Sequence, residues 1–239
     1  MRPAGRIFFI NFDQANACSK MLTLGIACKQ SLLSLTRICL NSQFDVSLQK
    51  DYSIMYIAQQ KRRENIAEYI LYLWQLEDLL RALKFSPEAI YTALVEPNDC
   101  DESDKQQIFM WYMSLVGLLR EEGKDERGHL SHTLHLITDV ENLHLQLLQL
   151  PVGAEYRNLW TPLKEELPRL RIVLARDGVS DIELCFRALY ATILYRIKGD
   201  NDKQGAIEDV VALISPAIAL LAKIYGQVER GEIDLVAAE

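Results

Sequence analysis

The sequence lacks the short motifs that mark most well-known catalytic and binding classes. It contains no glycine-rich phosphate loop and no Gly-x-Ser-x-Gly turn, so it predicts no nucleotide cofactor and no serine nucleophile of that type. Its five cysteines, at positions 18, 28, 39, 100 and 185, include no closely spaced pair, which excludes the usual zinc and dithiol motifs. An odd, scattered set of cysteines is typical of free thiols in a cytoplasmic protein.

Long apolar runs and a basic surface are also missing. We find no run that approaches the ~20 apolar residues of a membrane-spanning helix, so we expect a soluble protein. The net charge is −7, and residues 1–54 carry a net +3 from six basic and three acidic residues, leaving −10 for the remainder. An acidic body argues against nucleic acid or an anionic membrane as the main partner.

Apolar and polar residues nowhere alternate for long enough to predict a β-strand. Apolar residues instead recur at steps of three and four, as they do on one face of a helix. Start and stop signals predict helices over about residues 60–83, 103–122, 131–150, 161–176, 180–198 and 204–225. A further helix is predicted to begin at Ser86. Thr161-Pro162 is expected to start one of them, and Gly226 to end the last. The sequence therefore predicts an all-α protein, a single-domain bundle of six or seven helices over residues 55–226, with a tail at 227–239.

The first 54 residues differ from this pattern. They hold three of the five cysteines, and their apolar pieces, such as "IFFI" and "MLTLGIAC", are broken by polar residues. A secretory signal is a weak alternative, because Asn11 and Asp13 interrupt the stretch that should be apolar. We expect residues 1–54 to be a weakly structured upstream extension, with translation of the native protein beginning at Met55.

Three blocks of the helical part carry a resemblance to a known family. They are "KRRENIAEYILYLWQLEDLLRA", "GHLSHTLHLITDVENLHLQLL" and "DIELCFRALYATILYRI", which lie between Lys61 and Ile197. These stretches resemble the domain of unknown function DUF4924, a family of helical bacterial proteins common in Bacteroidetes. The resemblance implies a domain that begins near Met55, and it supplies no activity, cofactor or site residue.

The first predicted helix carries a polar stripe on an otherwise apolar segment. Glu64, Glu68, Gln75 and Asp78 lie within ~80° of one another around the helix, with Leu71 between them. A solvated face of a bundle helix explains such a stripe, and so does a groove flanked by aromatic rings. The candidate groove consists of Glu64, Glu68, Tyr72, Trp74, Gln75 and Asp78.

All four histidines lie between His129 and His144. His132, His135 and Asp139 share one helix face, which is a weak candidate for a Zn or Fe half-site. His144 points away from them, so we expect a hydrogen-bonded core residue there. Glu141 and His144 form one Glu-x-x-His pair, a unit that di-iron bundles use twice, and a single copy is weak evidence.

Two functions follow from these patterns. The first is a non-enzymatic helical module that binds a protein partner or forms a homodimer. The alternative is a metal-binding or hydrolytic helical bundle that uses the His132, His135 and Asp139 face. The patterns do not decide whether the protein is an enzyme, and they imply no cofactor.

Overall fold

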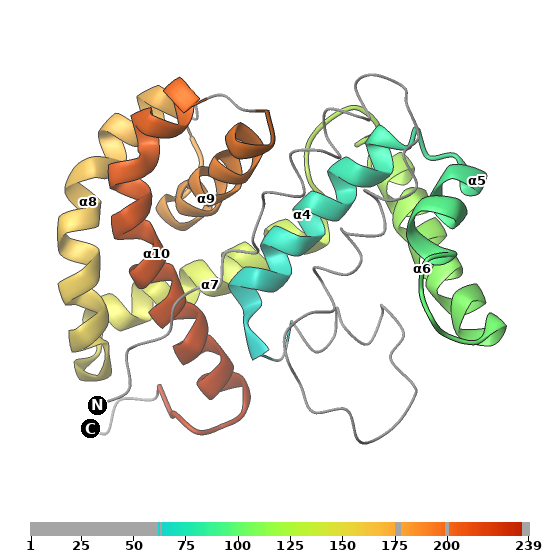
Figure 1. The fold of residues 1–239 in the computed structure, drawn as a ribbon. Coiled ribbons are helices and arrows are strands. Elements are labelled where there is room, and N and C mark those ends of the chain that lie inside the picture. The colour runs from blue at the N-terminus through green and yellow to red at the C-terminus, as the bar shows by residue number, and fades with distance from the viewer. Residues whose placement is uncertain (1–61, 63, 175–177, 199–200, 236–239) are drawn as a thin grey trace. The chain divides into compact units, whose positions relative to one another are not determined.

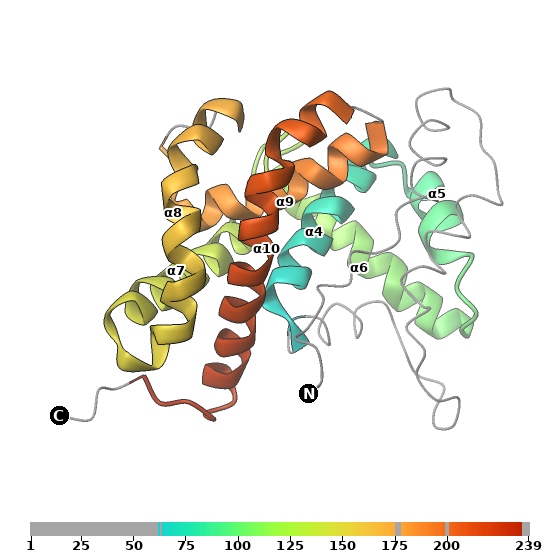
Figure 2. The same ribbon diagram turned by 60° about the vertical axis from the view of Figure 1, so that its left-hand side comes forward.

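In the computed structural model, the chain is described at residue 62 and over residues 64–174, 178–198 and 201–235. The predicted extension at residues 1–54 lies outside these ranges. Within them the regular structure is helical (Figures 1 and 2), and the α-helices are α4 (Ile66–Ala82), α5 (Pro87–Ile90), α6 (Glu102–Glu121), α7 (Ser131–Gln149), α8 (Ala154–Leu174), α9 (Asp181–Lys198) and α10 (Asn201–Glu229). The prediction of an all-α bundle with six or seven helices is confirmed.

Contacts between Cα atoms divide the chain into two compact units. The described part of one unit is residues 72–131, and the described part of the other is residues 62–71 with 132–235. We call them the 72–131 unit and the C-terminal unit. The division falls inside α4 and at the start of α7, so residues 55–226, predicted as one domain, are described below as two units.

The 72–131 unit packs the second part of α4 with α5 and α6 around one apolar core. α4 contributes Leu76 and Leu80, and α6 contributes Ile108, Tyr112 and Val116, all of them buried. Burial of such side chains stabilises a fold by about 1.5–3 kcal/mol each. α5 begins as predicted, since Ser86 accepts a hydrogen bond from the Ala89 amide and Pro87 occupies the first turn.

Two elements of this unit differ in detail from the sequence expectation. α5 continues directly into a π-helix, η1 (Tyr91–Val95), whose end is closed by Asn98, which donates to the carbonyls of Leu94 and Val95. α6 is capped by Asp101 and not by Ser103, because the Asp101 carboxylate accepts from the Asp104 amide at 2.8 Å. The positive end of the helix dipole also stabilises a carboxylate at this position. Gly123, with φ of 62°, ends α6 as predicted.

The C-terminal unit is built from the first part of α4 with α7, α8, α9 and α10, and α10 packs against both α8 and α9. α7 and α8 are joined by a tight 3₁₀ turn, η2 (Pro151–Gly153), in which Gly153 is required. A Cβ atom on Gly153 would lie only 1.8 Å from the Leu147 carbonyl oxygen. Arg157 of α8 closes the end of α7 by donating to the carbonyls of Leu147 and Leu150.

The predicted bounds of two helices in this unit were wrong. α8 starts at Ala154, directly after the 3₁₀ turn, so Thr161 lies inside the helix and its hydroxyl donates to the Arg157 carbonyl at 2.8 Å. α10 does not end at Gly226. It ends at Glu229, and Gly231, two residues later with φ of 70°, adopts the left-handed conformation that follows many helix ends.

One segment of α10 meets the length and composition of a membrane-spanning helix, so the expectation that no apolar run approaches this length was wrong. The segment is Gly205–Glu229, with a mean hydropathy of 1.8 over an 18-residue window, of which 44% is buried inside the structure. Core helices of globular proteins pass the same test. Ile214, Ala217 and Leu221 of this segment are fully buried, and the packing of α10 against α8 and α9 accounts for its apolar character.

Candidate functional site

The six residues of the predicted groove fall into two different units. Glu64 and Glu68 belong to the C-terminal unit, whereas Tyr72, Trp74, Gln75 and Asp78 belong to the 72–131 unit. Glu64 is exposed, and Glu68 is half-buried at the start of α4. The structure therefore describes these residues in two settings, and we treat each setting separately.

Glu68 takes part in the start of α4. The Asn65 side chain accepts hydrogen bonds from the amides of Ala67 and Glu68, and its Nδ2 donates to Glu68 Oε1 at 3.0 Å. This reciprocal arrangement resembles a capping box, with Asn65 as the cap and Glu68 three residues later. The role visible for Glu68 is therefore to help begin the helix.

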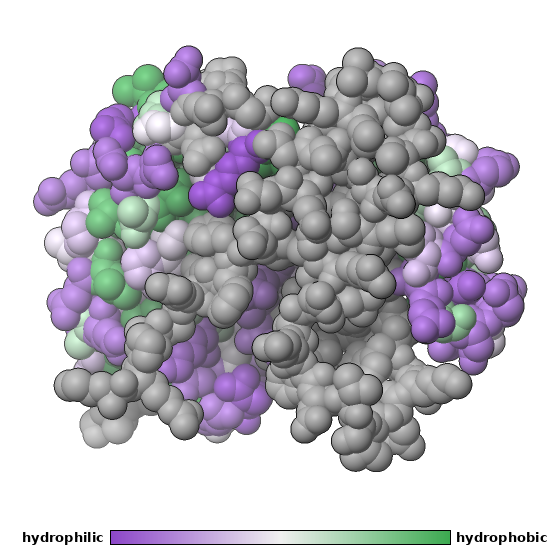
Figure 3. All heavy atoms as spheres, in the orientation of Figure 1, coloured by the Kyte–Doolittle hydropathy of each residue, from purple (hydrophilic) through white to green (hydrophobic). Residues whose placement is uncertain are grey.

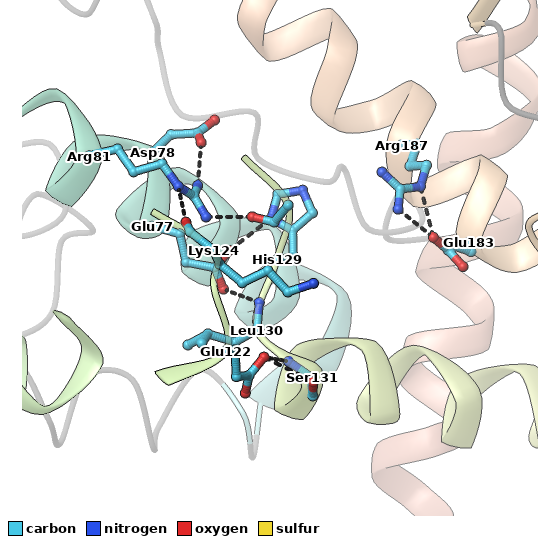
Figure 4. Close-up of polar contacts among 11 residues, drawn as sticks. Glu77, Asp78, Arg81, Glu122, Lys124, His129, Leu130, Ser131, Glu183 and Arg187 are labelled. Carbon is cyan, nitrogen blue, oxygen red and sulfur yellow. Dashed lines mark hydrogen bonds and ion pairs between the residues drawn. The ribbon is translucent and has the colours of Figure 1, made fainter. Parts of the chain in front are cut away.

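The central polar residue of the 72–131 unit is Glu77, which the sequence analysis did not select. It is 1% exposed, and its carboxylate is nevertheless hydrogen-bonded (Figure 4). Oε2 lies 2.8 Å from His129 Nδ1, and Oε1 accepts from the Leu130 amide at 3.3 Å. Because a carboxylate only accepts, Nδ1 of His129 is the nitrogen that carries the proton.

Arg81, one turn after Glu77, holds the same loop at two other points. Its Nε donates to the Lys124 carbonyl at 2.9 Å, and its Nη2 donates to the Gly128 carbonyl (Figure 4). Its Nη1 is paired with Asp78 at 2.7 Å. The planar guanidinium presents several donors in a fixed geometry, so one side chain can fix both ends of a short loop.

The remaining contacts of the loop come from an aromatic ring and from α6. Trp74 is fully buried, and its ring stacks on His129 with centroids 4.0 Å apart and planes 12° apart. Glu122, directly after α6, accepts from both the amide and the hydroxyl of Ser131. We call residues 123–131 the clamped loop, since Trp74, Glu77, Arg81 and Glu122 all bind it.

The chemistry of this arrangement is that of a structural clamp. A carboxylate that orients an imidazole also occurs in hydrolytic triads, where the imidazole then activates a nucleophile. Here one face of the His129 ring is covered by Trp74, and the nearby Ser131 hydroxyl donates to Glu122. The side chains that look catalytic are therefore engaged in holding the start of α7.

The predicted metal-binding face of α7 is on the surface. His132, His135 and Asp139 are all exposed side chains of the C-terminal unit. Among the residues that the structure describes, no group of three His, Cys, Asp or Glu side chains is arranged to hold a metal ion. The described part of the chain thus adds no further ligand group to this candidate.

His144 is the buried, hydrogen-bonded core residue that the sequence predicted. It is 3% exposed, its Nδ1 lies 2.7 Å from the Tyr156 hydroxyl, and its ring packs against Trp160. Burial lowers the pKa of His144 to about 4 and raises the pKa of Tyr156 above its usual value. Both side chains are therefore neutral near pH 7.

Glu141 and the two described cysteines lie in settings that give them structural rather than reactive roles. The Glu141 carboxylate accepts from the Ile182 amide at the start of α9, which is a helix-capping role rather than half of a di-iron site. Cys185 is fully buried, and burial raises the pKa of its thiol. The pKa of Cys100 is also raised, by burial and by Asp104, so neither thiol is activated as a nucleophile.

Comparison with known proteins assigns the chain to a family. Searches of curated proteins and of solved structures give no match. The sequence profile of a family described as a domain of unknown function, DUF4924, matches residues 55–232. This range is more than half of the chain and starts where the helical pattern of the sequence starts. The chain therefore belongs to the DUF4924 family.

Proposed function

We propose that this protein is a non-enzymatic helical interaction module that binds another protein surface through the solvent-exposed face of α6. We call this surface the α6 outer face. Gln107, Met110, Ser114, Leu118 and Glu121 are its exposed residues, and the half-buried Trp111 and Gly117 lie along its edges, with Trp111 also packed against the core of the unit. The proposal rests on one observation, the absence of charge along a helix that is half exposed. From Gln106 to Leu119 no residue of α6 is charged.

Exposed helix faces normally carry Lys, Glu or Arg, because these residues are well hydrated. On the α6 outer face, Met110 is 61% exposed and Leu118 is 43% exposed. Large apolar side chains that remain in water cost free energy that burial against a partner would recover. No chemically reactive group marks this surface, and the signal in the sequence is the uncharged run from Gln106 to Leu119.

Other exposed apolar groups support the proposal less strongly. On α8, Ile172 is 81% exposed and Val173 is 43% exposed, but both lie near residues 175–177, which are outside the described part of the chain. Figure 3 shows hydrophobic surface between hydrophilic side chains in the region of α8 and α10. Hydrophilic side chains interrupt those patches in Figure 3, whereas the α6 outer face has no charge between Met110 and Leu118.

Site-specific crosslinking in living cells tests the proposal. A photo-crosslinking amino acid replaces Ser114 of the full chain, expressed at its native level, and the matched control carries it at Asn142, an exposed position of α7. We expect a discrete covalent adduct from position 114 that is absent from position 142 and is lost on Leu118→Glu. No adduct from position 114 would overturn the proposed function.

The alternative function, metal binding at His132, His135 and Asp139, makes a different prediction. It requires about one transition-metal ion per chain that is lost in His135→Ala. We propose instead that the full chain, purified without a histidine tag, holds far less than one equivalent. Elemental analysis distinguishes the two outcomes.

We propose a bacterial cytoplasm as the place of action, in an organism of the Bacteroidetes, with a protein partner and no membrane or nucleic-acid partner. Support comes from the free thiols of Cys100 and Cys185, which persist in reducing compartments, and from the acidic net charge of −7. Fractionation of cells that express the protein natively checks the location.

A further inference from the structure

We propose that the occupant of the α6 outer face is a second copy of this chain, with the two α6 helices antiparallel about a two-fold axis at Ser114. This inference rests on the proposed function and names its partner. A two-fold interface must be complementary to itself, because the same surface is used by both copies. The pattern of residues around Ser114 satisfies this condition.

In an antiparallel pair centred on Ser114, each residue faces the one equally distant on the other side of the centre. Met110 of one copy then faces Leu118 of the other, and both are large, apolar and exposed in the single chain. At ~100° per residue, both side chains lie within about 40° of Ser114 around the helix. The two exposed apolar side chains of α6 would therefore cover each other.

The same symmetry places the largest side chain of the face opposite the smallest. Trp111 is three residues before Ser114, and Gly117 is three residues after it. Glycine destabilises a helix interior relative to alanine, so its presence calls for a reason. No atom lies within 4 Å of the position that a Cβ on Gly117 would take, so packing within the described chain does not require it. A Trp111 ring from a second copy would use this space.

The uncharged middle of α6 allows a second copy to approach at this face in spite of the net charge. Each chain carries −7, so two copies repel each other except where the local surface is uncharged. In the antiparallel pair Gln107 faces Glu121, and an amide can donate to a carboxylate without any like-charge contact. The antiparallel direction further pairs the helix dipoles favourably.

The size of the contact sets the expected affinity. One pair of helices over about five turns buries less than the ~1,600 Å² of a standard interface, so we expect a dissociation constant in the range of about 1–100 µM. Sedimentation equilibrium of the full chain over this concentration range should show a reversible monomer–dimer transition. A chain that stays monomeric throughout would overturn the inference.

Charge substitutions at the two-fold axis make the test specific. Ser114→Glu places two carboxylates against each other and should raise the dissociation constant at least about tenfold, as like charges in an interface do. Asn142→Glu, an exposed α7 position with the same added charge, should leave it unchanged. Ser114→Lys alone should also dissociate, and an equimolar mixture of Ser114→Glu and Ser114→Lys should restore the dimer. Thermal melts of each variant confirm that the fold is intact.

The outcomes separate this inference from the proposed function. A dimer that is insensitive to Ser114→Glu, or a mixture that fails to pair, would overturn the two-fold contact at Ser114. If the crosslinked adduct at position 114 contains a different protein, the α6 outer face is an interaction surface and its occupant is not a second copy. An adduct of twice the chain mass, together with restored pairing in the mixture, supports both.

Discussion

Glu77 is a fully buried charged residue of the 72–131 unit. Its buried carboxylate binds His129 and the Leu130 amide, and the ring of His129 is in turn stacked on Trp74. Removing one member of such a set leaves the others buried without their partner, which costs more than the original contact contributed. The position of Glu77 between Leu73 and Leu80, on the core face of α4, is the signal that could have identified it from sequence.

We predict a graded response among three acidic residues, Glu64 just before α4 and Glu68 and Glu77 within it. Glu77→Ala should lower the free energy of unfolding by about 3 kcal/mol, because it strands buried hydrogen-bonding groups. Glu68→Ala should cost about 1 kcal/mol, as loss of a helix cap does, and Glu64→Ala at most about 0.5 kcal/mol, as exposed substitutions do. Urea denaturation of the three variants side by side measures this. Equal, negligible shifts would contradict the structural roles assigned here to Glu77 and Glu68.

The buried His144 makes stability depend on pH in a defined window. Its pKa is about 4 in the folded protein and near 6.5 when unfolded, so protons bind preferentially to the unfolded chain between these values. Stability is therefore fully present above pH 6.5 and is lost as the pH falls toward 4, by about 3 kcal/mol for this one group.

Urea melts at pH 7.5 and pH 5 test this prediction. His144→Gln should be less stable than the parent at pH 7.5 and should lose less stability on acidification. His135→Gln, an exposed α7 position, is the control and should follow the parent at both pH values. A parallel response of parent and His144→Gln would show that His144 is not the group responsible.

At the scale of elements, sequence reasoning succeeded where a helix end is decided locally. Ser86 with Pro87, Gly123, and Ser180, whose hydroxyl accepts from the Glu183 amide, all act as predicted. It failed where two possible helix starts lie close together. Thr161-Pro162 has the pattern of a helix start, but α8 begins directly after the 3₁₀ turn that ends at Gly153. The helix therefore starts seven residues earlier than expected.

The clamped loop could not be predicted, because its contacts join residues about 45 positions apart. Arg81 reaches the carbonyls of Lys124 and Gly128, and no local pattern indicates that α4 lies beside this turn. Polarity around the helix identifies the candidate stripe in the sequence. Tertiary packing decides which polar side chains of α4 bind the clamped loop, and these are Glu77 and Arg81. Burial of Glu77 and Arg81 follows from tertiary packing and not from propensity.

Arg81→Lys should loosen the clamped loop without unfolding the unit. A lysine ammonium cannot bind two separate carbonyls and Asp78 in the geometry of the guanidinium, so we expect a loss of about 1–2 kcal/mol in local stability. Hydrogen exchange followed by mass spectrometry should show faster exchange in peptides covering residues 122–131. Arg187→Lys, in the Glu183 pair on α9 (Figure 4), is the matched control and should change exchange at its own site by little.

At the scale of the whole molecule, the charge and the family match both distinguish the first 54 residues from the rest. The helical part carries −10, whereas residues 1–54 carry +3. The family match covers residues 55–232, which include all but a few of the described positions. The all-α class could be predicted from periodicity alone, but the division into two units could not, because it depends on which helices contact each other.

We therefore expect residues 1–54 to be dispensable for folding, because they lack the periodic apolar face that packing into a helical bundle requires. A shortened chain that begins at Met55 should keep the thermal midpoint of the full chain to within a few degrees, the shift that ~1 kcal/mol produces in a chain of this size. Differential scanning calorimetry of the two chains under identical conditions measures this. Insoluble or molten shortened protein would show that residues 1–54 pack on the helical part, and the boundary would then have to move toward the amino terminus.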